Sequence, residues 1–193
     1  MEFDKDGRVI VPEVEIHEED NIIFKCNWND AGWKGICSKE AREFNVMKHH
    51  SWCCDKRNPC SEMIEKCEKG FPCMESRLFV DFVMGAGSYL KGEKGIMMEE
   101  KHIRGAQKGK LAFLTAVSPD TKEEERYFIG ILDIEEIKNE NNIQGNKESS
   151  IAINPKIKLK FWNYFRNKDM SKKWSSGRFR YVDDELVLTV LED

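Results

Sequence analysis

Basic and aromatic residues alternate in one stretch near the end of the chain, KIKLKFWNYFRNKDMSKKWSSGRFRY, residues 156–181. The stretch holds nine lysines and arginines and a single acid, whereas the rest of the chain holds 22 basic and 34 acidic residues. Lysine and arginine bind phosphates with release of counterions, and aromatic rings offer planes on which bases stack. The stretch therefore predicts contact with nucleic acid. The alternative is a solvated strand whose aromatic residues belong to the core.

The pattern within this stretch singles out individual side chains. On a strand, alternate residues share a face, so Lys156, Lys158 and Lys160 are expected to form one basic row. Trp174 lies in a polar segment, KKWSSG, and is the best candidate for an exposed ring. The residues of this stretch that we expect at the nucleic acid are Lys158, Lys160, Trp162, Trp174, Arg178 and Arg180.

A second candidate is the segment CNWNDAGWKGIC, residues 26–37, which combines two tryptophans, two cysteines and two glycines. The indoles of Trp28 and Trp33 can sandwich a base that has left its stack, and the glycines allow a close approach of the backbone. The alternative is that both tryptophans pack parts of the molecule together. We include Trp28 and Trp33 among the expected nucleic-acid contacts.

The cysteines form a third group, because five of the seven lie between residues 53 and 73, directly after His49 and His50. No CxxC pair occurs. If a helix begins at Pro59, Cys60 and Cys67 lie ~10 Å apart along its axis, too far to share one zinc ion or to form a disulfide. A four-ligand zinc knuckle is therefore not expected. Another metal site or cluster, at least one disulfide, and buried thiols all stay open.

Motifs of known catalytic chemistry are missing from the sequence. It has no GxSxG, HExxH or Walker-type loop, and GAGSYLKGEKG lacks the spacing of a phosphate-binding fingerprint. We therefore expect a non-catalytic binding module that needs no cofactor. The rival hypotheses are a small nuclease or RNA-modifying enzyme that uses His49 and His50, and an interaction module stapled by metal or disulfides.

These residues must be positioned by short elements. Apolar segments predict strands at residues 22–28, 78–84, 110–117, 126–134, 151–165 and 178–182, with an extended lead-in at 9–16. Helices are expected at 59–70 and 183–193, while 37–57 and 138–150 are expected to be irregular. The fold class is α+β, mostly β, as a small twisted sheet or open barrel. A Cys- and Trp-rich portion, 1–77, is expected to pack on a core, 78–193, or to be continuous with it.

The chain length and composition fit a folded protein without a membrane partner. Of its 193 residues 40% are hydrophobic and 34% charged, and no apolar run approaches the ~18 residues that a spanning helix needs. The acidic beginning of the chain lacks an apolar signal core, so we expect a cytoplasmic protein. Heavy use of lysine and glutamate is also typical of thermophile proteins.

Short motifs of the chain resemble a known family. RYFIGILDI, KLKFWNYF and WSSGRFRYV together resemble the core of the PUA-like superfamily, which includes EVE and YTH domains, over roughly residues 78–193. NWNDAGWKGIC and the cysteines after it are similar to segments at the front of nucleic-acid-processing and defence proteins. The combination resembles the N-terminal recognition domain of McrB-type subunits of modification-dependent restriction systems.

This resemblance implies a function and partners. Such a domain reads nucleic acid, often through a modified base held in an aromatic pocket, and is normally followed by an AAA+ GTPase motor that works with a nuclease subunit. DNA is favoured as the ligand, and RNA is the alternative. The positions of this chain that carry over are Trp162, Trp174, Arg178 and Arg180, with Trp28 and Trp33 as further candidates.

Overall fold

The computed structural model describes residues 21–48, 53, 73–91, 97–154, 156–157, 159–167, 170–174 and 177–192. Several expectations fall outside these residues, namely the lead-in at 9–16, the helix at 59–70, His49, His50, Lys158 and the thiols of Cys54, Cys60 and Cys67. No helix in the described ranges is long and apolar enough to span a membrane.

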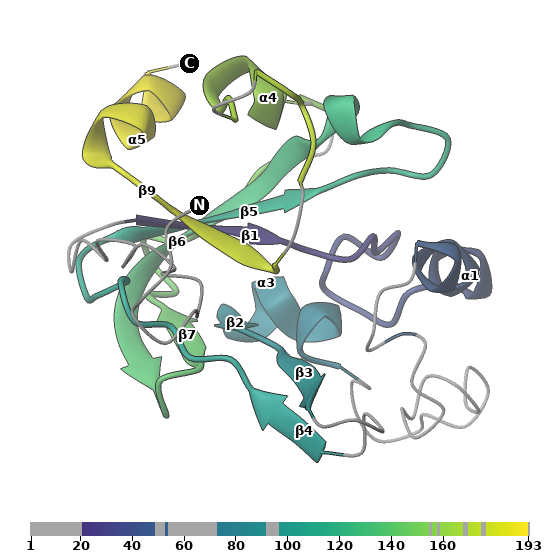
Figure 1. Cartoon of the computed structure of the whole chain (residues 1–193), viewed down its shortest axis with the longest axis horizontal. Helices are drawn as coiled ribbons and strands as arrows, with labels where there is room; N and C mark the ends of the chain where they lie inside the picture. Colours follow the sequence, from purple (N-terminus) through teal and green to yellow (C-terminus); the bar gives the residue numbers. More distant parts are fainter. Residues whose placement is uncertain are drawn as a thin grey trace, which may run out of the picture.

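One curled sheet organises the described chain (Figure 1). Its strands follow the order β2-β7-β6-β5-β1-β9, and β8 pairs with β6 beside this path. The strands are β1 (Asn21–Lys25), β2 (Val83–Gly85), β5 (Leu111–Ala116), β6 (Tyr127–Lys138), β7 (Asn142–Gly145), β8 (Ile151–Ala152) and β9 (Phe179–Val182). β1 and β5 are parallel, and every other pair in this sheet is antiparallel. β3 (Ser88–Lys91) and β4 (Met97–Glu100) form a separate antiparallel pair.

The central strands are largely apolar between their ends, and the side chains on both of their faces are buried. On β1, Ile22 and Phe24 point into one apolar cluster and Ile23 points into the other. The first cluster is covered by Leu78 and Phe79 of α3 (Leu78–Asp81). The second is covered by α4 (Phe161–Tyr164) and α5 (Asp184–Leu191), which lie above the sheet in Figure 1 while α3 lies below it.

Several predicted elements are confirmed. The segments 110–117 and 126–134 form the expected hairpin of β5 and β6, joined through the 3-10 helix η3 (Glu123–Glu125). Residues 179–182 are a strand, and the chain closes with α5, where the side chain of Asp183 accepts a hydrogen bond from the N–H of Leu186 at 2.9 Å. The mixed, mostly β class and the small twisted sheet also agree with the expectation.

Helices replace irregular or extended chain at two places, so the sequence prediction was wrong there. The segment 37–57 contains α1 (Lys39–Met47), whose first turn is capped by the Ser38 hydroxyl accepting from the N–H of Ala41. The segment 78–84 is extended only from Val83, because η2 (Met74–Arg77) and α3 precede it. Four-residue helices are shorter than the windows in which helical periodicity becomes visible.

Two further expectations were wrong for the chain that follows the β5–β6 hairpin. Residues 142–145, expected in a loop, form β7, which pairs with both β6 and β2 and buries Ile143. The long strand expected over 151–165 stops at Ala152, and the Asn154 side chain then accepts from the N–H of Lys156 in a turn. Lys156 therefore lies in a turn and Lys160 in an isolated bridge with Tyr127, so they do not share one strand face as a basic row.

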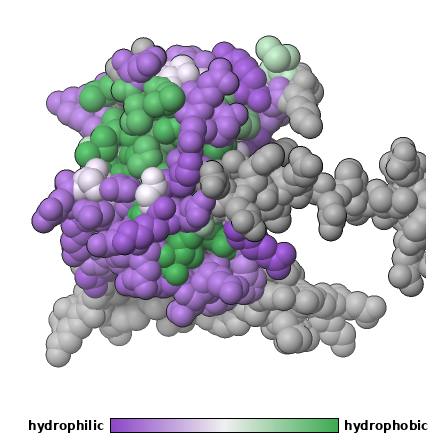
Figure 2. All heavy atoms as spheres, turned by 90° about the vertical axis from the view of Figure 1, so that its left-hand side faces the viewer, coloured by the Kyte–Doolittle hydropathy of each residue, from purple (hydrophilic) through white to green (hydrophobic). Residues whose placement is uncertain are grey.

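The outer face of α5 carries exposed apolar side chains, Leu188 and Leu191. Figure 2 turns the left-hand side of Figure 1 toward the viewer, and an apolar area occupies its upper part, at the level where Figure 1 places α5. Below this area the described surface is mostly hydrophilic and includes a second, smaller apolar area.

We predict that Gly130→Ala destabilises the fold by about 1–3 kcal/mol through overpacking. A Cβ at this position of β6 would lie 2.5 Å from the Phe79 ring and 2.6 Å from the carbonyl oxygen of Ile151. Urea unfolding measures the loss. Gly35→Ala is the matched control, since its Cβ would meet only the Ala31 Cβ at 3.3 Å. Equal unfolding midpoints for the two variants would contradict the predicted close approach.

Candidate nucleic-acid interface

Three cationic side chains gather at one end of the sheet. Because β1 and β5 are parallel, their carboxyl ends meet, and the antiparallel β6 and β9 begin at the same end. Lys25 is the last residue of β1 and lies opposite Thr115, while Arg126 directly precedes β6. Arg180 of β9 lies opposite Ile23, so it shares the face of the sheet that α4 and α5 cover. We call Lys25, Arg126 and Arg180 the cationic end.

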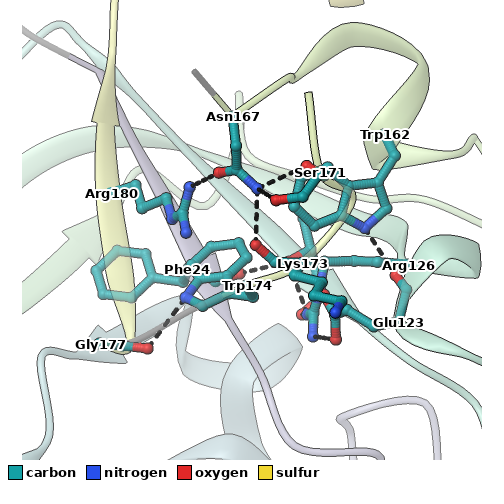
Figure 3. Close-up of polar contacts among 11 residues, drawn as sticks. Phe24, Glu123, Arg126, Trp162, Asn167, Ser171, Lys173, Trp174, Gly177 and Arg180 are labelled. Atoms are coloured by element: carbon teal, nitrogen blue, oxygen red, sulfur yellow. Dashed lines mark hydrogen bonds and ion pairs between the residues drawn. The ribbon is translucent and has the colours of Figure 1, made fainter. Parts of the chain in front are cut away.

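Trp174 lies between two of these cations (Figure 3). The guanidinium carbons of Arg126 and Arg180 are each 5.1 Å from the centre of its ring. The indole N–H donates to the carbonyl oxygen of Gly177 at 3.0 Å. Trp174 is only 7% exposed, so the expectation of an exposed ring is wrong. Both guanidinium groups gain a cation–π contact from this ring, which leaves little of it for a base.

A single carboxylate, that of Glu123, acts on all three cations. It pairs with Arg126 through two bonds of 2.5 and 2.8 Å, and the same guanidinium donates to the Thr115 hydroxyl at 3.2 Å. Arg126 is fully buried. Lys25 has no carboxylate partner among the residues that the structure describes. Lys25 therefore contributes a positive charge that pairs with no carboxylate in the described part of the chain, and an anion would neutralise it.

Burial makes this unpaired charge costly. Burial lowers the pKa of the Lys25 ammonium, and the charge of Arg126 lowers it further. Burial likewise lowers the pKa of the Arg180 guanidinium. Partly buried cations whose charged forms are disfavoured are typical of sites that receive a counter-charge from a ligand.

Asn167 folds the neighbouring loop around the cationic end. Its side-chain oxygen accepts from Arg180 at 2.7 Å, and its amide donates to the carbonyl oxygens of Ser171 and Lys173 at 2.6 and 2.9 Å (Figure 3). The loop thereby holds Lys172 and Lys173 at the surface, where both are exposed. Two lysines of the stretch 156–181 are thus exposed on the loop next to the cationic end.

Two other residues expected at the nucleic acid from this stretch have structural partners. Trp162 is fully buried, and its indole N–H donates to the carbonyl oxygen of Glu123 at 2.7 Å. It therefore offers no ring to a base. Lys160 is half exposed and pairs with Glu125 at 2.7 Å.

The segment 26–37 follows β1 as a loop held by asparagine side chains. The Asn29 oxygen accepts from the N–H of Ala31 at 2.8 Å, and Asn45 both accepts from the N–H of Trp28 and donates to its carbonyl oxygen. Trp33 is 1% exposed and meets Trp28 edge to face, with ring centres 5.8 Å apart and planes at 89°. Two perpendicular rings leave no parallel gap, so the expected sandwich by Trp28 and Trp33 is wrong. Trp28 alone keeps part of its surface open.

Arg178 is used inside the fold. Its guanidinium pairs with the buried carboxylate of Glu75, which also accepts from the N–H of Asn27 at 3.0 Å. This carboxylate thereby joins η2, the start of β9 and the loop after β1. The Arg178 side chain is 24% exposed and lies against Gly87, on the α3 side of the sheet. Its side chain thus lies on the α3 side, while its carbonyl oxygen accepts from the N–H of Lys25 at 2.7 Å.

The described cysteines lie around the same loop. Cys26 is buried, Cys37 is half-buried, and both are free thiols. Burial raises the pKa of the Cys37 thiol to about 11, and the nearby Cys73 adds to this shift. Within the described ranges no three His, Cys, Asp or Glu side chains lie close enough together to hold a metal ion.

Sequence reasoning missed Lys25, Arg126 and Glu75. Lys25 and Arg126 each adjoin an apolar strand, which is the ordinary place for a charged residue in any sequence. Only the pairing of β1 with β5 and β9 brings them together. Glu75 lies in the short helix η2, and nothing in the sequence distinguishes it from other acids.

Comparison with protein-family models gives no match, and neither curated proteins nor solved structures match the chain. The structure itself shows a curled, mostly antiparallel sheet, which agrees with the expected small twisted sheet. The function is therefore argued below from the side chains themselves.

We predict that Glu75→Gln destabilises the fold by roughly 3 kcal/mol, because a neutral amide leaves the charge of Arg178 poorly compensated. The value lies at the low end for broken buried pairs, since Arg178 keeps some contact with solvent. Denaturant unfolding measures the loss, and Glu75→Gln combined with Arg178→Met should recover part of it. Asp81→Asn, which breaks the exposed pair with Arg77, is the control and should cost at most about 1 kcal/mol. Equal losses for Glu75→Gln and Asp81→Asn would contradict the assignment.

We also predict slow alkylation of Cys37 at pH 8. A thiol with a pKa of about 11 forms on the order of 100-fold less thiolate there than one at the usual value of 9.0. Iodoacetamide labelling followed by peptide mass spectrometry measures the rate, which should rise about tenfold per pH unit up to pH 10. Labelling of Cys37 in the native protein as fast as in the urea-unfolded chain would refute the prediction.

Proposed function

We propose that this chain is a non-catalytic nucleic-acid-binding module whose main phosphate contact is the cationic end. The observation that carries the proposal is the convergence of Lys25, Arg126 and Arg180 around a single carboxylate, that of Glu123. A phosphodiester supplies a negative charge for Lys25 and accepts hydrogen bonds from its ammonium group.

The surroundings of the cationic end suit an extended polyanion better than a single small anion. Lys172 and Lys173 are exposed on the adjoining loop, and Lys160 lies one residue from the base of α4, which packs beside Arg126. Further phosphates along a strand would meet these lysines in turn. Such contacts strengthen binding through counterion release without reading sequence.

Base recognition in this proposal involves Trp28. It is the one tryptophan among the candidates whose side chain keeps part of its surface open, and Asn45 fixes its backbone in both directions. A base that has left its stack would lie against this ring. The resemblance to McrB-type recognition domains extends the proposal to a modified base, preferably in DNA, and to a motor and a nuclease as partners.

We predict that Lys25→Gln weakens binding to every nucleic acid and lowers the slope of log affinity against log salt by ~0.7–0.9. Fluorescence anisotropy with single- and double-stranded DNA and RNA, modified and unmodified, measures both quantities over a series of salt concentrations. The variant should fold at least as stably as the parent, because it removes a partly buried charge without a carboxylate partner. Lys147→Gln, an exposed lysine in the turn after β7, is the matched control.

The pH dependence gives the same experiment a second readout. Because the pKa of Lys25 lies below its usual 10.5, its charge is lost earlier than that of an exposed lysine as pH rises. Affinity should therefore fall on the alkaline side in the parent and change less in Lys25→Gln. Salt-insensitive binding by the parent, or equal slopes for parent and Lys25→Gln, would overturn the proposal.

A further inference from the structure

A second basic segment lies between β4 and β5, with the sequence KHIRGAQKGK at residues 101–110. We call it the basic loop. It contains no acid, and its basic side chains are Lys101, His102, Arg104, Lys108 and Lys110. It is short and lacks aromatic residues, so it does not stand out beside the stretch 156–181.

The backbone of the basic loop is held along its length. The N–H groups of Lys101, Ile103 and Gly109 donate to the carbonyl oxygens of Gly87, Glu140 and Ile134 at 2.9, 2.6 and 2.9 Å. The side chains of Ile103 and Ala106 are buried in the apolar cluster on the α3 side. These hydrogen bonds and buried side chains therefore fix the conformation of the basic loop.

Tyr181 of β9 adds the contact that connects the basic loop to the sheet. Its hydroxyl oxygen accepts from the N–H groups of Arg104 and Gly105 at 2.9 and 3.0 Å. A Cβ on Gly105 would lie 3.0 Å from the tyrosine ring, so only glycine permits this close packing. The backbone of Arg104 is thus fixed relative to β9.

The side chains of Arg104 and Lys108 point their charge outward. Both residues are exposed, and neither has an ion-pair partner in the described part of the chain. The other charges nearby are already engaged, since Lys110 pairs with Asp184, His102 with Glu140, and Glu100 accepts from Asn141. Arg104 and Lys108, together with the half-buried Lys101, are therefore left for an external anion.

The edge strand β9 connects the basic loop to the cationic end. Arg180 and Tyr181 are neighbours on this strand and point to opposite faces of the sheet. Arg180 belongs to the cationic end, and Tyr181 holds Arg104. The chain between β4 and β5 runs along the left-hand side of Figure 1, and Figure 2 shows that this side is mostly hydrophilic below α5, apart from a smaller apolar area.

We propose that the basic loop is a second phosphate-contacting surface, so that one nucleic acid crosses the β9 edge and is held on both sides of it. The ligand class is the phosphodiester backbone, contacted without regard to base. This inference rests on the proposed function, because it assigns the same ligand to a second surface.

The test is the double variant Arg104→Gln with Lys108→Gln, measured by anisotropy on a 20-nucleotide DNA over a salt series. The slope of log affinity against log salt should fall by ~1.4–1.8, which is two contacts at ~0.7–0.9 each. The preference among bases should stay unchanged. The thermal midpoint should also stay unchanged, because both side chains are exposed and the backbone contacts are kept.

The matched control is Lys122→Gln with Lys147→Gln, which removes the same charge from exposed positions in the β5–β6 hairpin and the turn after β7. A slope equal to that of the parent, or an equal loss in the control, would overturn the second surface. If Lys25→Gln still lowers the slope in that case, the proposed function stands without the basic loop. If the parent itself shows no salt-dependent binding, both fail.

Discussion

Burial of the central strands on both faces is the constraint on which the rest of the structure depends. β1 and β5, and β6 over its first half, cannot place a charged side chain between their ends without desolvating it, so their charges collect at the ends. The parallel pairing of β1 with β5 then brings together residues that are about 100 positions apart in the chain. The cationic end is a direct consequence of an apolar sheet with this strand order.

Three of the tryptophans that the sequence indicated as base-stacking rings are instead part of the core. Trp33, Trp162 and Trp174 are buried, and each donates its indole N–H to a backbone carbonyl oxygen. Trp174 also holds two guanidinium groups at fixed positions without neutralising them. An aromatic contact offsets part of the desolvation of a cation, and the carboxylate of Glu123 balances the charge of Arg126. Aromatic residues therefore position the basic ones.

Basic residues lie on and beside the edge strand β9. They oppose pairing with another strand, and they also suit the proposed binding of a polyanion. An exposed edge invites pairing with another strand, and charged side chains on it oppose such pairing. β9 carries Arg180, follows directly after Arg178, and is adjoined by the basic loop through Tyr181. Positive charge along the strand that ends the described sheet disfavours pairing with a second copy of this chain, and in the proposed function it attracts the polyanion. One arrangement thus serves both solubility and the proposed binding.

The sequence by itself determined the β5–β6 hairpin, the strand at 179–182, the closing helix and the segregation of basic charge into 156–181, because these depend on local periodicity, turn residues and composition. Only the tertiary structure decided that Trp174 is buried, that Lys156 and Lys160 share no strand face, and that Lys25 joins Arg126 and Arg180. The hydrophobic periodicity of a segment indicates which of its residues are buried. It does not indicate which other segment they pack against. The neighbours of Lys25 are set by strand pairing over long separations, which no local pattern encodes.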